Sequence, residues 1–304
     1  MKNPGIYSMA ARTIILCMIF TSFSCKEVKE PKESFSIAFL TDIHLTTENN
    51  AVEGFKQALD SVNRLNPDFI ITGGDLIMDA LGQSYGRADS LYNLYQQVIK
   101  NTGIPVYNTM GNHEIYGIVR SKSGADPSNQ EYGERMFEKR IGKSYYAVEN
   151  KGWKFIIINS IEDTKKEHYV GKVDSVQIEW IRSELKKTDP ATPIVLSTHI
   201  PFITALTQMN AGSTVPNDSG TVVYNSKEVL QLFKGYNLKL VLQGHLHTIE
   251  DIDINGIHFI TGGAISAAWW KGPNQGFEEG FMFLTFGPDD FRWRYVDYGW
   301  DAKK

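Results

Sequence analysis

The chain has 304 residues, of which 42% are hydrophobic and 12% aromatic, so it is long and apolar enough to bury one large core. This composition excludes a disordered or fibrous protein and favours one globular domain. The net charge of −4 at pH 7 provides no basic excess, so we do not expect a binder of nucleic-acid polymers.

The N-terminus has the pattern of an export signal. Lys2 and Arg12 precede the apolar run 13–23, and small residues follow at which a signal peptidase can cut. The apolar run is too short to span a bilayer as a stable helix. Residues 1–24 are therefore predicted to be a signal peptide that is removed on export.

Cys25 directly follows Ser24, and this arrangement resembles a bacterial lipoprotein signal, in which the cysteine becomes the lipidated first residue. Phe23 and Ser22 stand where that signal usually has a small residue and leucine, so an ordinary cleaved signal is the alternative. With lipidation, Cys25 anchors the protein to a membrane, in the periplasm or at the cell surface. Both interpretations place the protein outside the cytoplasm.

Residues 25–34 are predicted to be the lipidated cysteine and a solvated tether. The tether is charged, contains Pro31 and lacks apolar periodicity. The other cysteine, Cys17, lies in the signal, so the mature chain has no internal disulfide and no thiolate ligand for a metal. The folded domain is predicted to cover residues 35–304.

The first part of this domain alternates strands and helices. Short apolar runs predict strands at Phe35–Leu40, Phe69–Thr72 and Ile104–Met110. Apolar residues at helical spacing predict helices at Ala51–Leu65 and Leu91–Ile99. The resulting β-α-β-α-β series indicates a parallel sheet.

The second part opens with two paired strands, Tyr145–Val148 and Trp153–Ile158. Helices are predicted at Ser175–Lys187 and Glu228–Phe233, with a strand at Pro193–Ser197 between them. The candidate buried positions of the first helix are Val176, Ile178, Trp180, Ile181 and Leu185. Further strands are predicted at Leu238–Gln243, Ile249–Ile254, His258–Thr261, Phe281–Phe286 and Phe291–Asp297. We predict a layered α/β/β/α sandwich of two mixed β-sheets with flanking helices.

Five short polar motifs each follow a predicted strand. They are Asp42-Ile43-His44, Gly73-Gly74-Asp75, Gly111-Asn112-His113-Glu114, His199 alone, and Gly244-His245-Leu246-His247. Ligand groups gather where the carboxyl ends of parallel strands meet. Oxygen and imidazole donors without sulfur suit two divalent or trivalent transition-metal ions, namely manganese, iron or zinc. A two-metal site needs a bridging ligand, and we expect Asp75 to supply it because two glycines before it allow a tight turn.

The order D-x-H, GD, GNH, H and GHxH resembles the calcineurin-like metallophosphoesterase superfamily over residues 35–247. The resemblance implies that one ion is held by Asp42, His44, Asp75 and His247. It implies that the other is held by Asp75, Asn112, His199 and His245, which leaves His113 unligated beside the scissile bond. Purple acid phosphatases have glycine and tyrosine at the positions of His44 and Met78. The chain is thus more similar to the D-x-H branch, which includes cyclic nucleotide phosphodiesterases.

The predicted function is hydrolysis of a small phosphate ester, monoester or diester, by in-line attack of a hydroxide that bridges two metal ions. Besides the bridging Asp75, we expect Asn112 to stabilise charge on the phosphoryl oxygens and His113 to protonate the leaving alkoxide. Two alternatives are a hydrolase of nucleotide or lipid-headgroup diesters and a non-catalytic surface protein that binds phosphorylated ligands.

Two further features are expected to select the substrate. Trp269 and Trp270 can form an aromatic wall that stacks on a base or sugar, or they can cover a sheet edge. The long polar segment 202–224 begins just after His199 and is a candidate lid. Segment 116–130 is expected to enter the same crevice from the other side.

Overall fold

The computed structural model describes residue 1 and residues 33–302. Apart from residue 1, the predicted signal peptide lies outside the described residues, as do Cys25 and most of the tether. Within the described part of the chain, no helix is both long and apolar enough to cross a membrane.

The first sheet has five strands in the order β13-β12-β1-β2-β3. Their bounds are β1 (Phe35–Leu40), β2 (Phe69–Thr72), β3 (Val106–Asn108), β12 (Gly280–Phe286) and β13 (Phe291–Asp297). β1, β2 and β3 run parallel, whereas β12 is antiparallel to β1 and to β13. The carboxyl ends of the three parallel strands therefore lie at one edge.

The second sheet has six strands in the order β10-β11-β9-β8-β5-β4. Their bounds are β4 (Tyr146–Asn150), β5 (Trp153–Ile157), β8 (Pro193–Ser197), β9 (Asn237–Gln243), β10 (Ile249–Ile254) and β11 (Ile257–Gly262). The four central strands β5, β8, β9 and β11 are parallel, and the two edge strands are antiparallel. A separate pair, β6 (Ile161–Asp163) and β7 (Tyr169–Gly171), forms a two-stranded sheet.

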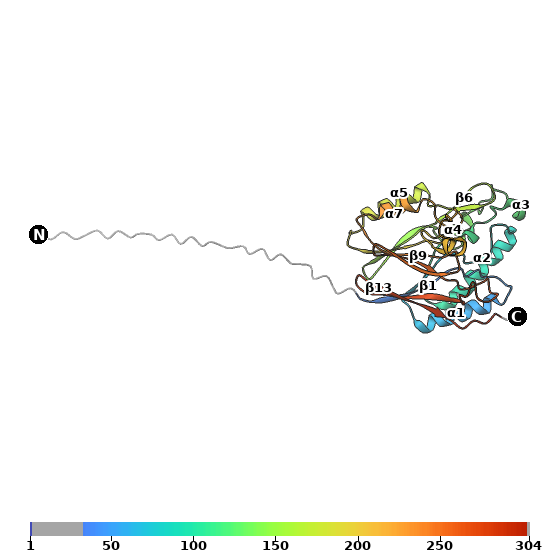
Figure 1. Ribbon diagram of the computed structural model, residues 1–304, viewed down its shortest axis with the longest axis horizontal. Helices are drawn as coiled ribbons and strands as arrows, with labels where there is room; N and C mark the ends of the chain where they lie inside the picture. The colour runs from blue at the N-terminus through green and yellow to red at the C-terminus, as the bar shows by residue number, and fades with distance from the viewer. Residues whose placement is uncertain (2–32, 303–304) are drawn as a thin grey trace. The chain divides into compact units, whose positions relative to one another are not determined.

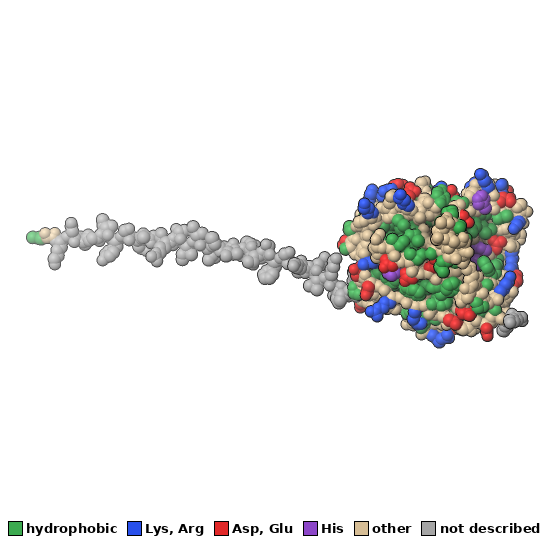
Figure 2. All heavy atoms as spheres, viewed as in Figure 1, with side chains coloured by type: hydrophobic (Ala, Val, Ile, Leu, Met, Phe, Trp, Pro, Cys, Tyr) green, Lys and Arg blue, Asp and Glu red, His purple; other side chains and the backbone are tan. Residues whose placement is uncertain are grey.

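Helices cover both outer faces of the two stacked sheets. Figure 1 shows α1 on one side of the sandwich, and α5 and α7 on the other. The helices are α1 (Ala51–Leu65), α2 (Tyr85–Ile99), α3 (Arg120–Ser123), α4 (Arg135–Arg140), α5 (Ser175–Lys186), α6 (Leu206–Ala211) and α7 (Ser226–Leu232), with 3₁₀ turns η1 (Lys100–Thr102) and η2 (Asn112–Glu114). On the face drawn in Figure 2, acidic and basic side chains are interspersed.

Alternation along the strands divides the apolar residues between two clusters. On β1, Ile37 and Phe39 pack in the cluster between the sheets, whereas Ala38 and Leu40 belong to the cluster beneath the helices. Successive strand residues point to opposite faces, so a strand covered on both sides must be apolar throughout. Each large side chain buried in this way contributes about 1.5–3 kcal/mol of hydrophobic stabilisation.

The structure confirms the predicted α/β/β/α sandwich and most of its elements. Helix α2 starts earlier than predicted, at Tyr85, because Ser84 caps it by accepting a hydrogen bond from the Arg87 amide. The prediction that Val176 is buried was wrong, since it is 67% exposed. Gln177 is buried instead and hydrogen-bonds Asn159.

Several short elements escaped the sequence prediction, namely α3, α4, α6, β6 and β7. Each has three to six residues, too few for an apolar period to repeat.

Candidate metal centre

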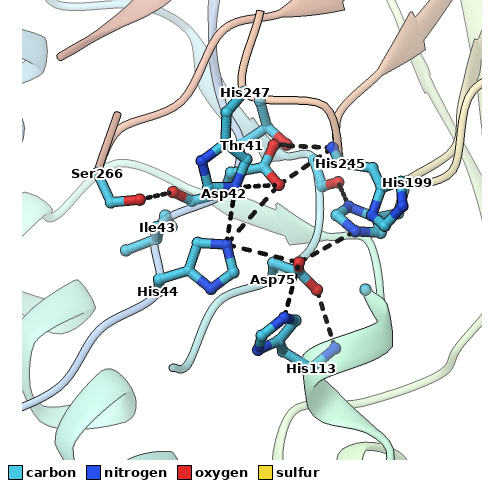
Figure 3. Close-up of polar contacts among 12 residues, drawn as sticks. Thr41, Asp42, Ile43, His44, Asp75, His113, His199, His245, His247 and Ser266 are labelled. Atoms are coloured by element: carbon cyan, nitrogen blue, oxygen red, sulfur yellow. Dashed lines mark hydrogen bonds and ion pairs between the residues drawn. The ribbon is translucent and has the colours of Figure 1, made fainter. Parts of the chain in front are cut away.

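The five motifs meet at the common edge formed by the carboxyl ends of the parallel strands. β1, β2, β3, β8 and β9 each lead into one motif, and Figure 3 shows the side chains converging from these loops. Three groups of side chains have ligand atoms close enough to share an ion: Asp42, His44 and His247; His44, Asp75 and His113; and Asp75, His199 and His245. The groups overlap through Asp75 and His44, so the centre is continuous.

Five of the predicted ligands have a left-handed backbone although none is glycine. Their φ values lie between +46° and +73°, at Asp42, His44, Asp75, His245 and His247. This conformation costs roughly 1–2 kcal/mol per residue, so surrounding contacts must hold it in place. Strain of this kind is concentrated at functional sites.

Asp75 lies at the middle of the centre. Its Oδ1 accepts a hydrogen bond from the backbone amide of His113 at 2.9 Å. Its Oδ2 lies 3.2 Å from His199 Nε2, 3.6 Å from His44 Nε2 and 3.8 Å from His113 Nε2. One oxygen thus positions the loop, and the other faces histidines from three different motifs, as a bridging ligand requires.

Asp42 organises the other side of the centre. Its Oδ1 lies 3.4 Å from His247 Nε2, and its carboxylate also accepts the backbone N–H of His245. The Nε2 atoms of His44 and His247 are 3.0 Å apart. Two ring nitrogens so close together repel each other unless a proton or a cation lies between them.

Backbone carbonyls fix which ring nitrogen faces the centre. His199 Nδ1 donates to Gly73 O at 2.7 Å, and His247 Nδ1 donates to Ala267 O at 2.5 Å. In the neutral form of each ring the proton is then on Nδ1, which leaves Nε2 free to act as a ligand, the usual arrangement of metal-binding histidines. His245 is turned the other way: its Nε2 bonds Gly220 O at 3.0 Å, which leaves Nδ1 for the centre.

Two buried carboxylates dominate the electrostatics. Burial opposes ionisation of Asp75, but the charge of His199 holds the pKa of its carboxyl well below the usual value. Burial also opposes ionisation of Asp42, and His247 lowers its pKa. Burial lowers the pKa of His245 to about 4. At His199 the charge of Asp75 outweighs burial and raises the pKa to about 9. The two carboxylates are therefore stabilised by neighbouring positive charge, which His199 and His247 provide and which bound metal ions can also provide.

The residues present fit a pair of transition-metal ions. The donors are carboxylate oxygens, imidazole nitrogens and the Asn112 amide oxygen, which lies 3.1 Å from His199 Nε2. His44, Asp75 and Asn112 are each at most 2% exposed, so their polar atoms are removed from water. The Nδ1 atom of His44 is buried without a hydrogen-bond partner. The polar contacts of this ring are therefore those that its Nε2 atom makes with His247, Asp75 and Asp42. All seven predicted ligands and His113 lie together.

Glu114 joins the GD and GNH loops. Its buried carboxylate accepts four backbone N–H groups, from Asp75, Leu76, Ile77 and Gly111, at 2.7 to 3.2 Å. Burial raises the pKa of Glu114 to about 8, and the N–H donors favour its ionised form. The role of Glu114 was not predicted from the sequence. An acid directly after a GNH motif is the signal that could have suggested it.

Glycine is required at two motif positions because atoms of neighbouring loops lie very close to the Cα atom there. A Cβ at Gly111 would lie 2.2 Å from the Asp75 nitrogen, and one at Gly244 would lie 2.1 Å from Thr41 Oγ1. Neither distance is compatible with a side chain. The loops can therefore pack closely only with glycine at these positions.

The two tryptophans differ in their surroundings. Trp269 is 42% exposed, and its ring centroid lies 4.7 Å from that of His247 and 5.9 Å from that of His44. Trp270 is buried, and its indole N–H bonds the carbonyls of Ile43 and His44. Of these two tryptophans, Trp269 is the one that is accessible to solvent beside the centre.

The two long loops occupy different places. Segment 202–224 contacts the centre through Gly220 O. In segment 116–130, Ser121 bonds Glu167, next to the turn between β6 and β7. Tyr169 on β7 was not predicted from the sequence to lie at the site, yet its ring packs edge-on to His245 with centroids 6.2 Å apart. No sequence pattern marks either Gly220 or Tyr169, because one acts through its backbone and the other lies on a three-residue strand.

Comparison with known proteins agrees with this site. The sequence model of the family described as calcineurin-like phosphoesterase matches residues 35–248. Two relatives are named as probable cyclic nucleotide phosphodiesterases. The protein from Psychrobacter arcticus is 24% identical over 249 residues, 74% of this chain and 78% of its own length. That from Xenorhabdus bovienii is 20% identical over 271 residues, 82% of this chain and 95% of its own.

Two solved structures share the fold. A dimetal phosphatase from Danio rerio is 13% identical with a TM-score of 0.59, covering 89% of this chain and 100% of its own. GAP50, described as the anchor in the inner membrane complex of Plasmodium, is 17% identical with a TM-score of 0.56, covering 87% and 85%. At these identities the likeness establishes the architecture alone.

Proposed function

Since this chain belongs to the calcineurin-like phosphoesterase family, we propose that its centre binds two metal ions through all seven predicted ligands and hydrolyses a small phosphate ester with His113 as the proton donor. The protein is a metal-dependent phosphoric ester hydrolase. The observation that carries the assignment of residues is the position of Asp75 Oδ2 within 3.8 Å of the Nε2 atoms of His44, His113 and His199.

The proposal divides the ligands between two ions that share Asp75. Asp42, His44 and His247 hold the first ion, and Asn112, His199 and His245 hold the second. When bound, the ions supply Lewis-acid stabilisation of phosphoryl charge and activate the attacking water. Manganese, iron and zinc all suit this donor set.

His113 is suited to proton transfer by its exposure and its anchoring. Its side chain is 24% exposed, whereas the side chain of His44 is 1% exposed and that of His199 is fully buried. Its Nδ1 donates to Met78 O, which orients the ring. Nε2 can therefore hold a proton on the accessible side of the centre and deliver it to a leaving alkoxide.

Replacing His113 tests this role. We expect His113→Ala to keep both metals and to lose about 10²- to 10⁴-fold in kcat for alkyl phosphates, the usual contribution of a general acid. Nitrophenyl esters should lose far less, because nitrophenolate leaves without protonation. His258→Ala is the matched control, since His258 lies on β11 and bonds Asp251 away from the centre. Equal losses for both ester types would exclude His113 as the acid.

Metal content and ester preference are measured together. The protein should contain two transition-metal ions per chain by elemental analysis and turn over p-nitrophenyl phosphate or bis-p-nitrophenyl phosphate. The faster ester identifies a monoesterase or a diesterase. The relatives named as probable cyclic nucleotide phosphodiesterases support the diester side. Diesters of nucleotides or of lipid headgroups are the alternative substrates that we propose.

A surface protein that binds phosphorylated ligands without turnover is the second candidate, because the groups of Asp and His side chains could hold metal ions that grip a phosphate without catalysing a reaction. The complete ligand set together with an accessible His113 argues against it. Two tightly bound metals, phosphate binding and no hydrolysis of any ester under manganese, iron or zinc would establish the binding role instead.

We further propose that the protein is exported and anchored to a membrane by lipid on Cys25, in the periplasm or at the cell surface. The apolar run 13–23 followed by Ser24 and Cys25 supports this. In a bacterial host, Cys25→Ser should abolish incorporation of a labelled fatty acid and release the protein from membranes. Cys17→Ser is the control and should change neither. Unlabelled, soluble protein from the parent chain would indicate an ordinary cleaved signal.

A further inference from the structure

We propose that the Trp269 indole is a stacking platform for the nucleobase of a nucleoside phosphate bound at the metal centre. The inference rests on the proposed function, because it assumes that the phosphate of the ligand occupies the centre. It goes further by assigning the recognition of the organic group to one residue.

Trp269 has the position that such a platform needs. Its ring lies against His247 and His44, both predicted metal ligands, with centroids 4.7 and 5.9 Å away. It is 42% exposed, whereas Trp153 and Trp270 are at most 1% exposed. A large indole left open to solvent beside a phosphate site offers its face to a ligand rather than to the core.

Neighbouring residues hold this indole in place. Trp270 is 1% exposed, and its N–H bonds Ile43 O and His44 O at 3.0 and 3.1 Å. Its ring packs so closely on α1 that a Cβ at Gly54 would lie 2.4 Å from it. Trp270 therefore anchors the segment, and the left-handed backbone at both tryptophans turns the neighbouring Trp269 away from the core.

The same segment is bonded to the ligand loops. Ser266 Oγ donates to Asp42 O at 2.8 Å, and Ala267 O accepts from His247 Nδ1. Asn274 Nδ2 donates to His247 O at 3.2 Å. The platform and the metal ligands thus form one hydrogen-bonded unit, so the distance from phosphate to ring is fixed before the ligand binds.

A nucleobase fits this arrangement better than a lipid chain or a bare sugar. Every nucleobase has a flat π-face, so any of the bases can stack on an aromatic side chain. A nucleobase is joined to its phosphate through one sugar, so phosphate at the centre leaves the base beside the flanking ring. A single exposed indole bordered by imidazoles does not provide the apolar groove that an acyl chain needs.

The test compares two phosphonates that cannot be hydrolysed at the ester position. One is the methylene phosphonate analogue of AMP, and the other is the corresponding ribosyl phosphonate without the base. Calorimetry on the metal-loaded full chain should show about tenfold tighter binding of the first, as one stacked base provides. Trp269→Ala should abolish this difference and leave the affinity for the ribosyl phosphonate unchanged. Trp269→Phe should retain part of it.

Trp180→Ala is the matched control, because Trp180 is a half-buried tryptophan on α5 that packs on Tyr145. It should preserve the base preference. Equal affinities of the parent protein for the two phosphonates, or a preference that survives Trp269→Ala, would overturn the inference. Failure of the proposed hydrolysis is detected separately by nitrophenyl ester turnover, since the binding comparison involves no reaction.

Discussion

The floor and the rim of the metal centre are built in different ways. The floor, which consists of the seven predicted ligands, follows the ends of sheet strands, and most of its side chains are buried. The rim, which consists of Tyr169, Trp269 and segment 202–224, comes from a two-stranded sheet and from loops. Side chains in the floor are oriented by backbone hydrogen bonds, whereas Trp269 in the rim is 42% exposed.

This difference suggests that the floor determines which reaction is catalysed and that the rim determines which substrate is selected. The predicted ligands at strand ends are held by the sheets, so we expect their chemistry to depend little on the sequence of the surrounding loops. In the proposed function, residues of the rim contact the group attached to the phosphate, and they touch the floor at few points, such as the bond of Gly220 O to His245. The contrast predicts that substitutions in the floor abolish metal binding and catalysis, and that substitutions in the rim change selectivity or produce small losses.

The largest effect should come from Asp75→Asn. The amide cannot place a charged oxygen among the three histidines that now face Asp75 Oδ2. We expect the loss of both metals and of kcat/KM to exceed the roughly 10- to 100-fold cost of replacing an outer partner of a metal ligand. Elemental analysis and ester turnover measure the two losses. Near-normal activity with two metals bound would mean that Asp75 does not bridge.

Glu114→Gln should have the next largest effect. The four backbone N–H groups that bond Glu114 need both of its oxygens as acceptors. In either orientation of the new amide, its NH₂ group faces two of these donors and leaves them without acceptors, at a cost of about 1–3 kcal/mol for each buried group. Metal affinity should fall by about 10- to 100-fold, as for other partners that orient ligands.

Glu131→Gln is the control for Glu114→Gln. Glu131 is also buried, but it pairs with Lys139 and Arg140 away from the ligand loops. Both substitutions should lower the melting temperature, and only Glu114→Gln should weaken manganese binding by calorimetry. Similar metal affinities in the two variants would show that Glu114 contributes stability alone.

The same contrast explains how much of the fold could be predicted from sequence. The bounds of β1, α1 and β2 were predicted as observed, because strands buried on both faces are apolar throughout and α1 repeats its apolar residues at helical spacing. Val176 was misplaced because apolar character alone does not determine the face of a short helix. Gln177, with its amide satisfied by Asn159, took the inward position.

The floor of the site could be anticipated because its side chains carry the chemistry and stand in short motifs. Positioning groups were harder to predict. Gly220 and Ala267 act through carbonyl oxygens, which every residue possesses. Trp269 and Trp270 have adjacent positions and the same side chain, yet one is exposed and the other buried, as a result of the left-handed backbone at this turn.

The smallest expected effect links the rim to the floor. Asp218 Oδ1 accepts the N–H groups of Gly220 and Thr221 at 2.9 and 2.8 Å, and this turn presents Gly220 O to His245 Nε2. Asp218→Ala should loosen the turn and weaken binding of one of the two metal ions about three- to tenfold, the equivalent of one net hydrogen bond. Calorimetric titration of the metal-free protein with manganese measures this loss.

Asp189→Ala is the control for Asp218→Ala, because Asp189 closes a similar exposed turn through the Ala191 amide, at a site unrelated to the centre. It should leave both metal affinities unchanged. If Asp218→Ala also leaves them unchanged, the carbonyl of Gly220 does not orient His245, and the floor is independent of segment 202–224. If it weakens one ion selectively, that ion is the one held by His245, and movement of this segment provides a route by which the rim can act on the chemistry of the floor.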